Sequence, residues 1–128
     1  MRAKDIWKYF EMCREYAFMP SCHEDKREHH HCALVVRGRD DVTVMARNGS
    51  VKFDNMKRRI PQSHSEVRAL SRSSKNSIMF VVRINPSKQF RLSKPCPSCE
   101  SYMRSSKKIK TVYYTISETE FGVIDFDR

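Results

Sequence analysis

Two short motifs of the chain carry residue types that bind metal ions and transfer protons. They are His64-Ser-Glu66 and Pro95-Cys-Pro-Ser-Cys99. Histidine and cysteine are ligands that Zn²⁺ prefers, and three protein ligands leave a fourth tetrahedral position open for a water molecule. His64, Cys96 and Cys99 therefore predict a zinc site with an open, catalytic position and Zn²⁺ as the cofactor.

Glu66 follows the histidine by two positions and need not bind the metal. A carboxylate beside a metal-activated water can act as a general base and then as a general acid. A lone C-x-x-C would be explained equally well by a structural zinc knuckle or a redox pair. Its combination with an upstream H-x-E and a preceding proline favours catalysis, with Glu66 as the catalytic residue.

Two helix starts must position these side chains. Cys96 and Cys99 have i, i+3 spacing at the start of a helix expected at about residues 96–104, so both sulfur atoms lie on one face. The positive end of the helix dipole favours their thiolate forms. His64 begins a second expected helix, at about residues 64–73, and at its first turn His64 and Glu66 both project past the helix end.

The remaining elements follow from hydrophobic periodicity. We expect a helix at residues 4–18, a hairpin of strands at 33–36 and 42–46, a strand covered on both faces at 77–84, a loop at 85–94, and antiparallel strands at 110–116 and 122–126 joined by a turn at 117–120. This order predicts a single domain over residues 1–128, a three-layer α/β/α sandwich with a mixed five-stranded sheet.

Composition narrows the classes of function. The chain has 25 Lys and Arg against 15 Asp and Glu, a formal net charge of +10, which favours phosphorylated or polyanionic partners. No apolar run is long enough to span a membrane, and no apolar core follows the charged start, so we expect a soluble, cytoplasmic protein. Five cysteines favour reduced thiols, with Cys13, Cys22 and Cys32 as small buried apolar residues.

Three consecutive histidines, His29 to His31, come before the first expected strand. A second metal site is one interpretation, but consecutive residues of an extended chain point alternately to opposite faces, so three adjacent histidines cannot reach one ion. We expect that one imidazole lies near the mouth of the active site or that all are solvated.

Basic residues gather around the cysteine motif. Residues 83–110 contain one acidic residue, Glu100, and eight basic ones, a net charge of +7: Arg83, Lys88, Arg91, Lys94, Arg104, Lys107, Lys108 and Lys110. A solvated surface explains such a run, and so does attraction of the phosphate groups of a nucleotide or of a nucleic acid strand.

His64-Ser-Glu66 and Pro95-Cys-x-x-Cys99 resemble the signature of the zinc-dependent cytidine deaminase superfamily, H-x-E…P-C-x-x-C. The resemblance implies a hydrolase of nucleotide metabolism with a cytidine deaminase-like fold. Zinc would activate water, Glu66 would take its proton, and attack at C4 would convert a cytosine compound to its uracil form with release of ammonia. It further implies that Asn48, Ser65, Ser93 and Pro95 contact the substrate.

The substrate is left open by two cues that disagree. A histidine as first ligand resembles the nucleotide and polynucleotide branches of the superfamily, whereas the short final hairpin, with no helix before the last strand, resembles the smaller nucleoside-type enzymes. The leading expectation is a cytosine nucleoside or its monophosphate. The alternatives are cytosine in single-stranded DNA or RNA, with Phe53 and Phe90 as candidate stacking residues, and a zinc-stabilised, non-catalytic binding module. Related enzymes are often homo-oligomers.

Overall fold

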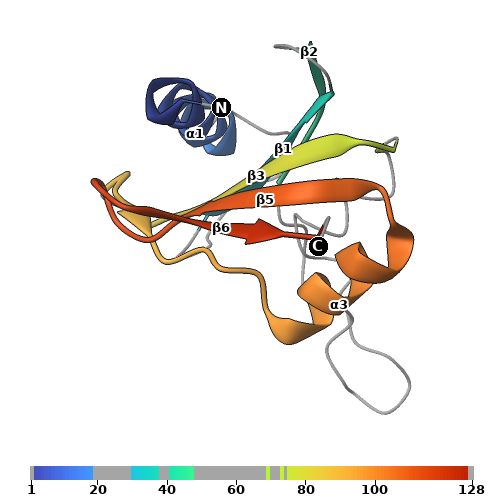
Figure 1. Cartoon of the computed structure of the whole chain (residues 1–128). Coiled ribbons are helices and arrows are strands. Elements are labelled where there is room, and N and C mark those ends of the chain that lie inside the picture. The colour runs from blue at the N-terminus through green and yellow to red at the C-terminus, as the bar shows by residue number, and fades with distance from the viewer. Residues whose placement is uncertain are drawn as a thin grey trace.

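The computed structural model describes residues 2–18, 30–37, 41–47, 69, 73 and 75–126. Within them the chain is a mixed α/β structure with one open sheet and two helices (Figure 1). The helices are α1 (Ala3–Ala17) and α3 (Pro97–Ser106), and the strands are β1 (His30–Arg37), β2 (Asp41–Arg47), β3 (Ser77–Ile84), β4 (Phe90–Arg91), β5 (Ile109–Thr115) and β6 (Phe121–Asp125).

The sheet has the strand order β2-β1-β3-β5-β6, with the short β4 paired to β3. Among the described strands only β3 and β5 pair in parallel, and α3 lies in the connection between them. The pairs β1–β2 and β5–β6 are antiparallel, which confirms both expected hairpins. A mixed sheet is thus confirmed, but it has six strands rather than the expected five.

The additional strand β4 lies in the segment expected to be a loop. A turn after β3 reverses the direction of the chain. Two hydrogen bonds to Asn85 hold this turn: the Lys88 N–H donates to the Asn85 carbonyl oxygen (2.9 Å), and the Gln89 N–H donates to Asn85 Oδ1 (2.9 Å). Lys88 has a φ of 65°, the left-handed conformation that closes this turn. Phe90 and Arg91 then pair with Ile84 and Arg83. A strand of two residues has no detectable sequence period, so the sequence could not predict it.

Two buried clusters cover the two faces of the sheet. Alternate residues of β3 divide between them: Phe80, Val82 and Ile84 pack with α1, while Met79 and Val81 pack with Cys99 and Met103 of α3. This division explains why β3 is almost continuously apolar, as the sequence predicted. In Figure 1, α1 and α3 accordingly lie on opposite sides of the sheet.

α1 covers its face of the sheet with an aromatic cluster. Tyr9 and Phe10 are both buried, and their ring centroids lie 4.7 and 5.9 Å from that of Phe80. Cys13 and Cys32 are buried in the same cluster and form no disulfide, which confirms the prediction that they are small apolar core residues; Cys22 lies outside the described residues. Neither α1 nor α3 has the length and apolar character of a membrane span.

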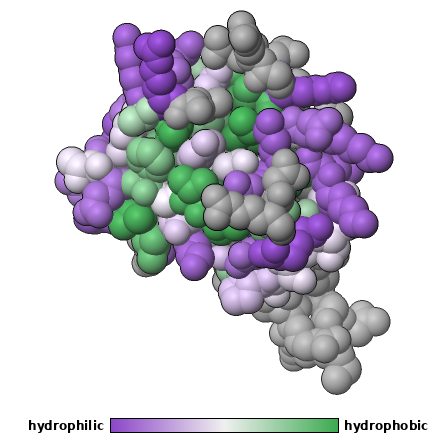
Figure 2. Space-filling model, viewed as in Figure 1, coloured by the Kyte–Doolittle hydropathy of each residue, from purple (hydrophilic) through white to green (hydrophobic). Residues whose placement is uncertain are grey.

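On the face drawn in Figure 2, hydrophilic residues cover much of the described surface. Figure 2 shows apolar patches between them on the face seen in Figure 1. The large apolar side chains with the greatest exposure in the described part are Leu92, Tyr102, Ile116 and Val123.

Candidate metal centre

Cys96 lies at the N-terminus of α3. It is the N-cap residue, with an extended backbone (φ −66°, ψ 160°), and Pro97 takes the first position of the helix, where a missing N–H costs no hydrogen bond. The Cys96 carbonyl oxygen accepts the first helical hydrogen bond from the Glu100 N–H (2.9 Å). The expected helix start at the cysteine motif is therefore confirmed, and the partly exposed Cys96 side chain lies at the helix end.

Cys99 occupies the first turn of the same helix and is fully buried. It belongs to the cluster that covers the α3 face of the sheet, and Cys96 packs against this cluster. Neither cysteine forms a disulfide. The two cysteines therefore lie within one turn at the start of α3, and their role as zinc ligands stays a prediction.

Ser93 fixes the segment that leads into the cysteine motif. Its Oγ lies 2.9 Å from the Val81 carbonyl oxygen, 3.1 Å from the Thr115 carbonyl oxygen and 2.9 Å from Thr115 Oγ1. Its N–H also donates to the Thr115 carbonyl oxygen (2.9 Å). These contacts hold residues 92–95 across the ends of the parallel strands β3 and β5. Ser93 thus has a positioning role, and its contact with a substrate stays a prediction, as does that of the buried Pro95.

His64, Ser65, Glu66 and Asn48 lie outside the described residues. The chain just downstream is described at two positions. Ala69 is helical and fully buried in the same cluster as Cys99, and Ser73 Oγ donates to the Ala69 carbonyl oxygen (2.7 Å). Helical Ala69 is consistent with the helix expected from His64, and it lies on the α3 face of the sheet.

In the described ranges no three His, Cys, Asp or Glu side chains gather into a metal-binding group. The two cysteines are unbridged and of a donor type that zinc prefers, and the predicted third ligand, His64, lies outside those ranges.

The basic residues around the motif point in different directions. Lys88 Nζ lies 5.4 Å from the centroid of the Phe18 ring, at the end of α1, so Lys88 is engaged away from α3. Lys94 is exposed and comes directly before Pro95. Phe90 is buried against α1, with the Arg14 guanidinium 4.0 Å from its ring centroid, so the expectation that Phe90 is free to stack on a base is wrong. Phe53 lies outside the described residues.

The resemblance to the zinc deaminases is carried by two short motifs. No family model matches the chain, and no curated protein is similar to it in sequence. Family membership therefore stays a proposal.

Proposed function

We propose that the chain is a zinc-dependent hydrolytic deaminase, which converts a cytosine nucleoside or its monophosphate to the uracil form and releases ammonia. One observation carries the proposal. Cys96 and Cys99 are unbridged thiols on the first turn of α3, on the face of the sheet where helical Ala69 packs just downstream of His64-Ser-Glu66. In this proposal the helix that holds Ala69 begins at His64, as the sequence predicts, and brings the third ligand to the same face of the sheet as the two cysteines.

In this proposal the fold is a three-layer α/β/α sandwich of the cytidine deaminase type. The two clusters on opposite faces of the sheet support the layers, and the short β5–β6 connection resembles the smaller nucleoside-type enzymes. Reduced cysteines suit a compartment such as the cytoplasm.

The proposed chemistry divides between the metal and the protein. His64, Cys96 and Cys99 would hold zinc, which would supply a Lewis acid that lowers the pKa of a water molecule. Glu66 accepts a proton from the attacking water as the water oxygen bonds to C4 of the ring, and passes this proton to N3. Glu66 then delivers a second proton from the water to the exocyclic amine, the C4–N bond breaks, and ammonia leaves. One carboxylate thus serves as both base and acid.

The test combines metal content with ammonia release. Purified protein would be assayed for zinc and then incubated with cytidine, deoxycytidine, their monophosphates and cytosine-containing oligonucleotides. The proposal predicts one zinc per chain and ammonia with a mononucleoside or mononucleotide. Stoichiometric zinc without ammonia from any of these compounds would instead indicate a zinc-stabilised binding module.

Single-stranded nucleic acid is the alternative substrate. It has less support than the mononucleotide, because Phe90, one of its two candidate stacking residues, is buried. Salt separates the two classes, because binding to a polyanion weakens steeply with salt in proportion to the phosphates contacted. A shallow salt dependence of KM supports a mononucleotide or nucleoside.

A further inference from the structure

Three cationic or titratable side chains lie in one row across the sheet. In the register of the strands, Arg83 of β3 is opposite Arg91 of β4 on one side and opposite His31 of β1 on the other. Residues directly opposite each other on neighbouring antiparallel strands project from the same face, with Cβ atoms about 4.5–5.5 Å apart. Arg91, Arg83 and His31 therefore form a continuous row, here called the basic row.

The residues beside the row show which face it occupies. Phe90, Ile84 and His30 form the adjacent row, and all three lie on the α1 face: Phe90 and Ile84 belong to the cluster with α1, and the His30 ring centroid is 4.4 Å from that of Phe18. Side chains alternate along a strand. The basic row therefore projects from the opposite face, which carries α3, Cys96 and Cys99.

The described part of the protein offers few acceptors and no carboxylate to balance the charges of Arg83 and Arg91. Arg83 Nε is buried and has no hydrogen-bond partner in the described part of the chain. Within those same residues neither Arg83 nor Arg91 forms an ion pair, and Arg91 Nη2 donates to the neutral Gln89 Oε1 (3.2 Å). Like charges directly opposite on paired strands repel, and an unsatisfied buried donor costs free energy. A bound anion would relieve both penalties.

The row also lies at the same end of the sheet as the segment that leads into the candidate metal centre. Ser93 Oγ contacts the Val81 carbonyl oxygen, and Val81 is two residues before Arg83 on the same face of β3. The Arg91 carbonyl oxygen accepts a hydrogen bond from Thr115 Oγ1 (2.8 Å) at the end of β5. Ser93 is three residues, at most about 11 Å of chain, from Cys96. The carboxyl ends of parallel strands are where α/β sheets bind ligands.

We propose that His31, Arg83 and Arg91 form a phosphate-binding site that holds the 5′-phosphate of a cytosine mononucleotide while its base lies at the metal centre. Arginine guanidinium groups match a phosphate with paired, charge-assisted hydrogen bonds. The substrate identity rests on the proposed deaminase function, whereas phosphate binding by the row does not. The phosphate is unchanged by the reaction, so the site affects affinity and choice of substrate.

The kinetic test compares Arg91→Gln and Arg83→Gln with Lys88→Gln. Lys88 is a matched control, since it is an exposed cation of the same β3–β4 turn that faces Phe18. We expect each arginine variant to raise KM for deoxycytidine 5′-monophosphate by about tenfold or more, as for loss of a charge-assisted contact. In both arginine variants KM for deoxycytidine should stay within about twofold of the value for the unmodified chain. Lys88→Gln should leave KM for both substrates unchanged. Arg91 is exposed, so its variant stays informative if Arg83→Gln fails to fold.

A second measurement does not need catalysis. Inorganic phosphate should raise the melting temperature of the unmodified chain and of Lys88→Gln, because a ligand that binds only the folded state stabilises it. The rise should be lost in Arg91→Gln. That result would support the phosphate site even if no compound is deaminated. The absence of deamination would then count against the proposed function and not against the phosphate site. Equal phosphate stabilisation in all variants, equal KM effects on nucleotide and nucleoside, or preferred deamination of an oligonucleotide would each overturn the proposal.

Discussion

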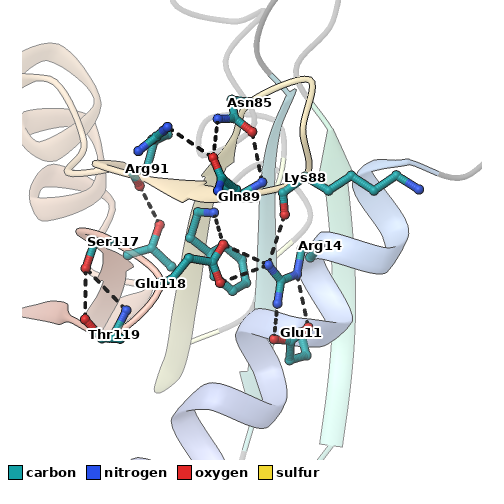
Figure 3. A network of polar contacts seen from close by, with 11 residues as sticks. Glu11, Arg14, Asn85, Lys88, Gln89, Arg91, Ser117, Glu118 and Thr119 are labelled. Carbon is teal, nitrogen blue, oxygen red and sulfur yellow. Dashed lines mark hydrogen bonds and ion pairs between the residues drawn. The ribbon is translucent and has the colours of Figure 1, made fainter.

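Arg14 of α1 and Glu118 of the β5–β6 turn form an ion pair that joins three parts of the molecule (Figure 3). Arg14 Nη1 donates to both Glu118 carboxylate oxygens (3.0 and 3.2 Å) and to the Lys88 carbonyl oxygen (3.0 Å), and Glu118 Oε1 also accepts the Phe90 N–H (2.6 Å). The network ties α1 to β4 and to the β5–β6 turn. It therefore holds the short strand that carries Arg91.

Charge on Arg14 is well compensated. Burial lowers the pKa of the Arg14 guanidinium, but hydrogen bonds and electrostatic attraction from Glu11 and Glu118 outweigh it, so the pKa lies above its ordinary value. Arg14 is therefore cationic at any pH at which the protein is studied.

Glu118→Ala should destabilise the fold by about 1–2 kcal/mol, because it removes an acceptor of one main-chain N–H and of the Arg14 guanidinium. The estimate is at the low end for charged hydrogen bonds, since the Glu118 side chain is 43% exposed and solvent screens the pair. Urea unfolding measures the change. Glu120→Ala, in the same turn, is the matched control and should stay within about 0.5 kcal/mol. Equal stability of the two variants would show that the network does not stabilise the fold.

The buried Cys13 should make the protein less stable at alkaline pH. Burial raises the pKa of the Cys13 thiol in the folded state, and the neighbouring Cys32 raises it further, whereas a thiol of the unfolded chain titrates near about 8.5. Above that pH the folded state binds more protons than the unfolded state. The free energy of unfolding therefore falls as pH rises, by up to about 1.4 kcal/mol per pH unit, until the folded-state pKa is reached.

Denaturant unfolding at about pH 7.5 and about pH 9.5 tests this dependence. Cys13→Ala removes the titrating group, so its loss of stability between the two pH values should be smaller than that of the unmodified chain. The same loss in both proteins would assign the alkaline effect to other groups.

Cys96→Ala and Cys99→Ala should each lose bound zinc, together with the stability that zinc ligation adds to folding. Metal content per folded chain is the measurement. Cys32→Ala is a control of the same chemistry, because it removes a buried thiol on the α1 face of the sheet. It should lower stability while keeping full zinc occupancy. Full occupancy in both Cys96→Ala and Cys99→Ala would remove these residues from the site.

Long, strongly patterned elements were predictable from the sequence. The strand at residues 77–84 has the predicted bounds, and the helix expected at 4–18 is observed as Ala3–Ala17. Each has an apolar pattern with a single period, and the apolar residues of that pattern are buried in the structure. The cysteine helix was predictable for a different reason, because Pro95 and Pro97 mark its start chemically.

The features that the sequence did not reveal depend on contacts between distant residues. Arg14 and Glu118 are more than a hundred residues apart, and neither has a sequence context that indicates its partner. The sequence shows Arg83 only as one charge in a basic run, because its row with Arg91 and His31 depends on the register of three strands. The predicted roles of His64, Glu66 and Asn48 remain predictions, because these residues lie outside the described ranges.

The most direct test of the deaminase assignment is the rate of ammonia release by Glu66→Ala, measured at the same zinc content as the unmodified chain. The variant keeps all three proposed ligands, so zinc and fold should persist. The rate should fall by about 10²–10⁴-fold or more, because the carboxylate would both take up and deliver protons. A variant with activity within about tenfold of the unmodified chain, about 1.4 kcal/mol of barrier, would contradict the mechanism even if the zinc is bound.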